Sequence, residues 1–195
     1  MQWLSWLVLV FSSVALADSG PFSVESAIYR VEVPSSDGRT ISQGTGVLIA
    51  QDKILTNCHV VKGGGSPGVI HRQTGKRFYT TGYYSLGNFD ACVLRGGFVG
   101  SPAPISAEAR EGESVWVFGY PSAMPVVIQG TVKGLAEFRS GRSLVLTAFC
   151  SPGSSGAPVV NARGQIVGLQ WGMVQYQNNQ CLAIPASFLV PFLGA

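Results

Sequence analysis

Two adjacent serines lie between two glycines in the stretch SPGSSGAPVV, which covers residues 151–160. Stretches rich in Gly, Ser and Pro are usually turns, because glycine adopts positive φ and proline fixes the turn backbone. A serine hydroxyl becomes a nucleophile only where a base removes its proton and a third group orients that base. The chemistry open to this chain therefore depends on a histidine and a carboxylate elsewhere in the sequence.

The sequence offers two histidines as the base and ten acidic residues as its partner. His71 lies in the polar stretch HRQTGKR, whereas His59 ends the strand-like stretch ILTNCHVV, whose apolar and β-branched residues would hold its ring still. Asp90 runs directly into the apolar segment ACVL, where a carboxylate needs a partner to offset its loss of water. The alternatives are a core histidine with satisfied hydrogen bonds and an Asx turn that caps the strand. If the two residues meet, Asp90 would fix the tautomer of His59.

Glycines stand on both sides of the serine pair at 154–155. They permit the tight backbone that points two N–H groups at one place, as an oxyanion hole requires. The amides of Gly153 and Ser155 can converge where a tetrahedral oxyanion would form, and Ser154 would then point away. The spacing therefore predicts Ser155 as the nucleophile, with the amides of Gly153 and Ser155 as the oxyanion hole.

The rest of the chain indicates an all-β protein. Short apolar runs, many rich in Val and Ile, recur between turn residues, and no long stretch repeats with helical spacing. These runs fall into two sets, joined by a stretch rich in Gly, Ser, Pro and Glu. We expect one globular domain built from two β units, residues 18–97 and 114–195, with residues 98–113 as the linker.

The first residues read as a secretory signal. An apolar run ends in Ala-Leu-Ala at 15–17, which predicts cleavage after residue 17 and export to a periplasm or to the medium. A signal anchor is the alternative, because the usual positive residues before the run are missing. No later apolar run approaches the roughly 20 residues that a membrane span needs, so we expect no span once the signal is removed.

Composition argues against several other classes of function. The net charge is +3, and the one basic cluster, at 71–77, lacks the interleaved aromatic residues of a nucleic-acid surface, so we expect a solvated hairpin there. The four cysteines form no Cys-x-x-Cys pair, so we predict neither a metal site nor a cofactor. An even number of cysteines in an exported chain favours two disulfides, in any of three connectivities.

Seven stretches resemble, in the same order, those of the chymotrypsin-like serine proteases, and within them the HtrA/Deg-like bacterial branch. They read GTGVLIA, ILTNCHVV, DACVLR, GESVWVFGYP, PGSSGAP, GQIVGLQWG and LAIP. The chain order His, Asp, Ser also separates this group from subtilisin-like and α/β-hydrolase enzymes. The resemblance implies two six-stranded antiparallel β-barrels with the active site in the cleft between them. We expect no PDZ module, since ten residues follow Pro185.

The resemblance also assigns roles to the residues singled out above. His59 would be the general base, Asp90 its orienting carboxylate and Ser155 the nucleophile, with the Gly153 and Ser155 amides as the oxyanion hole. The chain is then expected to be a serine endopeptidase that acts on proteins or peptides through an acyl-enzyme. The alternative is a catalytically idle binding module on the same scaffold, because a fold does not fix a function.

Two disulfides follow from the same resemblance. The triad geometry brings the segments of Cys58 and Cys92 together, and Cys150 and Cys181 fall on opposing walls of the primary specificity pocket. We therefore expect the pairs Cys58–Cys92 and Cys150–Cys181, with the other two connectivities kept open.

The walls of the primary specificity pocket match residues 147–152, 170–173 and 181–184, none of which is charged. A buried charge in the substrate would stay unpaired there, so we expect cleavage after small or medium apolar residues, with Phe149 and the disulfide making the pocket shallow. The residues expected to line the pocket are Ala148, Phe149, Gln170, Gly172, Met173 and Leu182.

Overall fold

The computed structural model describes most of the chain. The described residues are 20–38, 41–62, 64–138, 141–174 and 180–193. The expected signal peptide, residues 1–17, lies outside them. Within the described ranges, no helix combines the length and the apolar character that crossing a bilayer requires.

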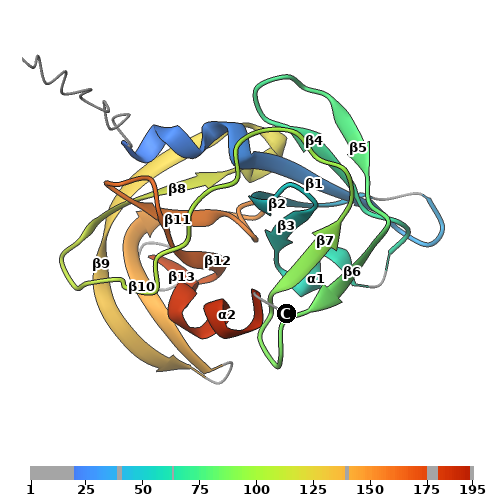
Figure 1. Ribbon diagram of the computed structural model, residues 1–195. Coiled ribbons are helices and arrows are strands. Elements are labelled where there is room, and N and C mark those ends of the chain that lie inside the picture. Colours follow the sequence, from blue (N-terminus) through green and yellow to red (C-terminus); the bar gives the residue numbers. More distant parts are fainter. Residues whose placement is uncertain (1–19, 39–40, 63, 139–140, 175–179, 194–195) are drawn as a thin grey trace, which may run out of the picture.

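The N-terminal half forms one antiparallel sheet, drawn from blue to green in Figure 1. Its strands are β1 (Ile28–Pro34), β2 (Ile41–Ala50), β3 (Lys53–Thr56), β4 (Gly68–His71), β5 (Arg77–Tyr79), β6 (Gly82–Ser85) and β7 (Cys92–Arg95). They pair in the order β5-β4-β1-β2-β3-β7-β6. The first core lies against β1, β3 and β7, whose side chains are almost all buried.

The expected all-β fold class is confirmed, but this half differs from the expected six-stranded barrel in detail, because its sheet has seven strands and stays open as a half-barrel. Among the described strands, β5 pairs only with β4 and β6 only with β7. Two residues of chain bridge the gap between these edges: the Thr80 amide donates to Pro67 O and the Thr81 amide to Arg95 O. The chain crosses from one edge strand to the other here, so no ladder joins them.

The C-terminal half is a closed barrel of six antiparallel strands, as expected, and is drawn from yellow to red in Figure 1. The strands are β8 (Ser114–Gly119), β9 (Val126–Phe138), β10 (Gly141–Phe149), β11 (Pro158–Asn161), β12 (Ile166–Val174) and β13 (Gln180–Pro185). Small and β-branched side chains fill the inside, as in other narrow barrels. The interior residues include Val117, Leu146, Ala157 and Val159.

The described helices are short. They are the 3₁₀ segments η1 (Pro21–Ala27) and η2 (Pro121–Ala123), and the α-helices α1 (Cys58–Val61) and α2 (Ala186–Leu193). The prediction that ILTNCHVV continues as a strand to His59 is wrong, because β3 ends at Thr56 and α1 begins at Cys58. The Asn57 side chain between them donates to Asp90 O at 2.6 Å, which turns the chain away from the sheet.

Helix α2 packs against the segment that carries Asp90. The Phe188 ring stacks on Phe89 with 5.9 Å between centroids, and Phe192 meets the same ring edge-on. Aromatic pairs of this kind add about 0.5–1.5 kcal/mol beyond the area they bury. The last helix of the C-terminal half therefore supports a turn of the N-terminal half, next to Asp90.

Candidate active site

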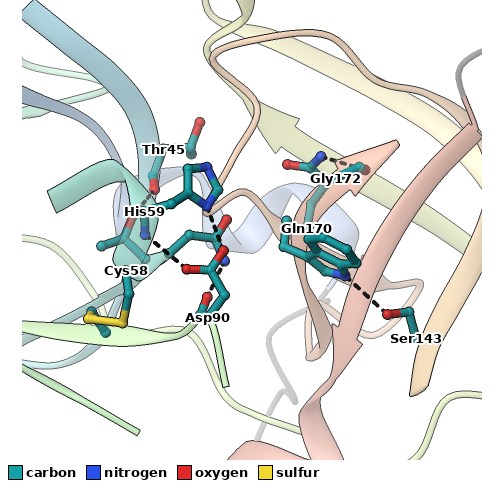
Figure 2. A network of polar contacts seen from close by, with 11 residues as sticks. Thr45, Cys58, His59, Asp90, Ser143, Gln170 and Gly172 are labelled. Atoms are coloured by element: carbon teal, nitrogen blue, oxygen red, sulfur yellow. Dashed lines mark hydrogen bonds and ion pairs between the residues drawn. A yellow bond between two sulfur atoms is a disulfide. The ribbon is translucent and has the colours of Figure 1, made fainter. Parts of the chain in front are cut away.

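His59 and Asp90 form a direct pair. His59 lies in α1, and Asp90 lies in the turn before β7. The His59 Nδ1 atom is 2.5 Å from Asp90 Oδ2, and the His59 amide donates to Asp90 Oδ1 at 2.9 Å (Figure 2). Because Nδ1 faces a carboxylate it carries the proton, and Nε2 is left as an acceptor. The side chains are 48% and 31% exposed, so the pair can be reached from solvent.

Two further ties hold this pair. The Cys58–Cys92 disulfide joins the residue before His59 to the second residue after Asp90, with 4.9 Å between the Cα atoms. The buried Asn57 side chain binds the carbonyl of Asp90. Besides the direct contact, the backbone segments that carry the ring and the carboxylate are therefore joined by a disulfide and by a hydrogen bond.

Ser155 lies on a loop that crosses from the barrel to the sheet. Its carbonyl accepts the amide of Thr45 in β2 at 2.7 Å, and the amide of the next residue, Gly156, donates to Gln170 O in β12 at 2.8 Å. A Cβ added to Gly156 would overlap Thr45 O and the Thr56 hydroxyl, so only glycine fits. The loop thus places Gly156, the residue after Ser155, against Thr56 at the end of β3 and against Asn57, which precedes the helix of His59.

The backbone around Ser155 leaves two amides open. Among the described residues, the N–H groups of Gly153 and Ser155 have no acceptor, whereas those of Ser154, Gly156 and Ala157 all donate to carbonyl oxygens. Gly153 has φ +97°, a value that a side chain would make unfavourable. Two unpartnered N–H groups separated by one residue are the donors that a site for a negatively charged oxygen requires.

The two serines differ in their surroundings. Ser154 is 2% exposed and its side chain packs against Gly119 of β8, whereas Ser155 is partly exposed. The other histidine, His71, has both ring nitrogens in use: its ring is buried, Nε2 donates to Ser26 O, and Nδ1 accepts from Thr74. Nδ1 therefore supports the turn of the β4–β5 hairpin, and Nε2 ties that hairpin to η1.

Thr45 is a residue of the site that the sequence analysis missed. It is fully buried in β2, and its hydroxyl donates to Gly153 O at 3.0 Å while accepting the Tyr120 amide at 3.1 Å. It reaches both from β2, a strand of the N-terminal half of the molecule. The only sequence signal is its position in the glycine-flanked stretch GTGVLIA.

The expected specificity-pocket residues lie on β10, β12 and β13. Gly172 pairs with Leu182 and Met173 with Cys181 across two neighbouring strands, and the Cys150–Cys181 disulfide ties β13 to the segment after β10. The other expected residues are Ala148, buried in the barrel core; Gln170, almost fully buried; and Phe149, whose side chain is 52% exposed.

Gln170 carries a buried atom without a partner. Its Nε2 donates to Gly172 O at 3.0 Å, but its Oε1 has no hydrogen bond in the described part of the chain and no contact with solvent. An unsatisfied buried acceptor costs about 1–3 kcal/mol. The wall expected from the sequence to be apolar thus includes one acceptor oxygen.

A small cavity borders Asp90 and is otherwise lined mostly by residues of the C-terminal barrel. Its volume is about 120 Å³ and it lies between Phe89, Asp90 and the indole of Trp171. The Trp171 Nε1 donates to Ser143 Oγ at 3.1 Å, which fixes the indole as one wall. No group of three or more His, Cys, Asp or Glu side chains in the described residues could hold a metal ion.

The geometry of this site can be set beside known proteins. The sequence model of the trypsin-like peptidase domain family matches residues 44–169. The chain belongs to this family. A protein named glutamyl endopeptidase from Staphylococcus epidermidis is 29% identical over 187 residues, which cover 85% of this chain and 64% of that protein. A Staphylococcus aureus protein of the same name is 26% identical over 176 residues, which cover 79% and 49%. This trypsin-like peptidase thus spans less than two thirds of the length of these relatives.

Solved structures share the fold. The active form of the Rv3671c protease from M. tuberculosis superposes with a TM-score of 0.80 at 20% identity, covering 97% of this chain and 93% of that one. The HtrA-type protease AlgW, with a bound tripeptide, gives a TM-score of 0.77 at 19% identity, covering 87% and 59%. The predicted resemblance to chymotrypsin-like serine proteases and the serine peptidase class are confirmed. The likeness to HtrA-type proteases is one of fold.

Proposed function

We propose that this trypsin-like peptidase is an exported endopeptidase that cleaves peptide bonds through Ser155, His59 and Asp90. His59 Nε2 takes the proton from Ser155 Oγ as that oxygen attacks the substrate carbonyl, and Asp90 stabilises the imidazolium. The amides of Gly153 and Ser155 hold the oxyanion. The imidazolium protonates the leaving amine as the peptide bond breaks, which leaves an acyl-enzyme on Ser155. A water molecule then attacks the acyl carbon while His59 takes its proton. The return of that proton to Ser155 Oγ releases the acid and restores the enzyme.

The observation that carries this proposal is the pairing of His59 Nδ1 with Asp90 Oδ2 at 2.5 Å. It supports a base whose tautomer is fixed and whose Nε2 is free, which is the state that a serine nucleophile requires. The unpartnered amides of Gly153 and Ser155 support the second half of the mechanism, since they lie on the same loop as the nucleophile. An idle binding module would need neither feature.

Digestion of unfolded casein tests the activity itself. We expect the purified protein to release peptides, and Ser155→Ala to lose turnover by several orders of magnitude, as the removal of a triad nucleophile does. Ser154→Ala is the matched control and should keep most of the activity. Binding of casein without cleavage by the unmodified protein would instead favour the idle module on the protease scaffold.

Specificity is the finer part of the proposal, and two candidates stand. The names of the staphylococcal relatives favour glutamate before the cleaved bond rather than the apolar residue expected from the sequence. In this chain, however, the three expected walls carry no cation, and Gln170 offers them a buried acceptor oxygen. A carboxylate would face that oxygen unpaired, which is unfavourable. We therefore propose an uncharged residue at this position, with glutamate as the second candidate.

A peptide library separates the two candidates. Mass spectrometry of the products identifies the residue before each cut. Preferred cleavage after Ala, Val or Leu supports the uncharged pocket. Preferred cleavage after Glu would instead give this chain the glutamate specificity that the names of its relatives state. Gln170→His, which introduces a cation-forming side chain into the wall, should shift the preference towards Glu if Gln170 lines the pocket.

Export and the division into two units are further parts of the proposal. Both disulfides suit an oxidising compartment such as a periplasm or the medium. The expected linker at 98–113 lies along the barrel, with the Ile166 amide donating to Pro104 O and the Ser106 amide to Ile166 O. Mass measurement of the protein recovered from outside the cytoplasm tests export and cleavage after residue 17 together.

A further inference from the structure

The basic cluster that the sequence analysis left as a solvated hairpin borders a cavity. The cavity holds about 430 Å³, and it lies between the β4–β5 hairpin and the segment that follows β8. This volume falls in the range of sites for small organic ligands and peptide segments. Its walls include Arg30, Ile70, Arg72, Arg77, Tyr120 and Pro125.

The charges of the cavity do not balance. Arg30 and Arg77 share one carboxylate, Glu32, with N–O distances of 2.8 and 2.5 Å. Arg72 has no carboxylate partner in the described part of the chain, and its Nη1 is buried without any acceptor. Arg30 Nε is buried without an acceptor as well. Guanidinium donors left unpaired in a partly buried place favour an incoming anion, above all one that accepts two hydrogen bonds.

Arg72 and Tyr120 connect the cavity to the rest of the molecule. The Arg72 guanidinium carbon lies 5.8 Å from the centroid of the Tyr120 ring, which is within cation–π range. Tyr120 is 6% exposed, and this burial raises the pKa of its hydroxyl, while the charges of Arg72 and Arg30 act in the opposite direction. The tyrosine thus meets Arg72 with both its ring and its hydroxyl, and it carries no negative charge to neutralise the arginines.

The lining suits an extended ligand better than a bare ion. Ile70, Ala123 and Pro125 give the cavity apolar walls between the arginines. Ser122 and Ala123 have φ of +50° and +65°, and such strained non-glycine residues are found where a loop clamps a ligand. A glutamate or aspartate side chain brings both the carboxylate and a short stretch of peptide to fill this space.

We propose that the cavity between the β4–β5 hairpin and the segment 120–125 binds an acidic peptide segment, with a carboxylate seated on Arg72. It is distinct from the site of Ser155, although Tyr120 borders both: its carbonyl packs against Gly153. The choice of a peptide rests on the proposed function, since a protease meets peptide chains as its substrates. The carboxylate requirement rests only on the arginines.

Fluorescence anisotropy with a labelled, end-capped tetraglutamate peptide tests the proposal on the Ser155→Ala protein, so that cleavage plays no part. We expect saturable binding that Arg72→Gln weakens at least about tenfold, the effect of losing one hydrogen bond to a charged group. Arg163→Gln, which removes an exposed arginine far along the chain, should leave the affinity unchanged. Far-ultraviolet circular dichroism should be the same for all three proteins.

Three outcomes would overturn the proposal. One is equal binding of a tetraglutamine peptide, which shows that no carboxylate is needed. The second is equal loss of affinity in Arg72→Gln and Arg163→Gln, which indicates non-specific attraction to positive charge. The third is full displacement of the peptide by inorganic phosphate at the same concentration, which assigns the cavity to free anions. None of these outcomes depends on whether Ser155 hydrolyses peptides.

Discussion

The hydroxyl of Thr45 in the N-terminal sheet donates a hydrogen bond to the carbonyl of Gly153 in the C-terminal barrel, at 3.0 Å. The Thr45 hydroxyl oxygen also accepts a hydrogen bond from the Tyr120 amide, and the Thr45 amide donates to Ser155 O. One buried threonine therefore holds the backbone on both sides of Ser154. These bonds hold the peptide planes 153–154 and 155–156, which lie on either side of the plane that carries the open Ser155 amide, one of the two proposed for the oxyanion hole.

Thr45→Val should lower kcat by about tenfold or more with a much smaller change in KM, because a displaced oxyanion donor weakens transition-state stabilisation. Thr45→Ser keeps the hydroxyl and should retain most of the activity. Initial rates with a short ester substrate measure both constants. A purely structural role would predict that Thr45→Val loses stability while kcat of the folded fraction stays the same.

Gly156→Ala should abolish activity and destabilise the protein, because its Cβ would overlap Thr45 O and the Thr56 hydroxyl. Gly112→Ala is the matched control. The two glycines have φ of +85° and +80°, but a Cβ at Gly112 meets nothing within 4 Å. The control carries only the cost of a left-handed alanine, about 1–2 kcal/mol. If the urea concentration at the unfolding midpoint fell equally in the Gly156→Ala and Gly112→Ala proteins, the tight contact at Gly156 would be contradicted.

The two disulfides allow stability and positioning to be separated. They span 34 and 31 residues, so removal of either one as a double Cys→Ala variant should cost a similar amount, about 3–4 kcal/mol on the chain-entropy model. Only the loss of Cys58–Cys92 should also lower kcat, because that bond flanks His59 and Asp90. Urea unfolding and initial rates on the folded proteins measure the two effects. An equal fall in kcat for both variants would count against the positioning role.

The contacts that the sequence could predict are those with a local signal. Asp90 stands out because it borders an apolar run, and Ser155 because glycines flank it. The strands of the barrel follow from short apolar runs between turn residues. Each of these inferences uses neighbours along the chain.

The contacts that the sequence could not predict depend on distant residues. Thr45 is 108 residues from its partner Gly153, and the glycines beside it do not indicate which distant residue it contacts. Asn57 ends β3 through a bond to Asp90 O, so the helical turn of His59 is set by tertiary structure rather than by propensity. Arg72 reads as a solvated residue of a hairpin, but in the fold its guanidinium lies against the Tyr120 ring and its Nη1 is buried.

Labelling with a fluorophosphonate probe tests the central proposal most directly, because this probe reacts with an activated serine hydroxyl. Peptide mapping after labelling should place the modification on Ser155 in the unmodified protein and in Ser154→Ala. The Ser155→Ala protein should remain unlabelled. Modification of Ser154, or no labelling of the folded, unmodified protein, would contradict the assignment of Ser155 as a nucleophile activated by His59 and Asp90.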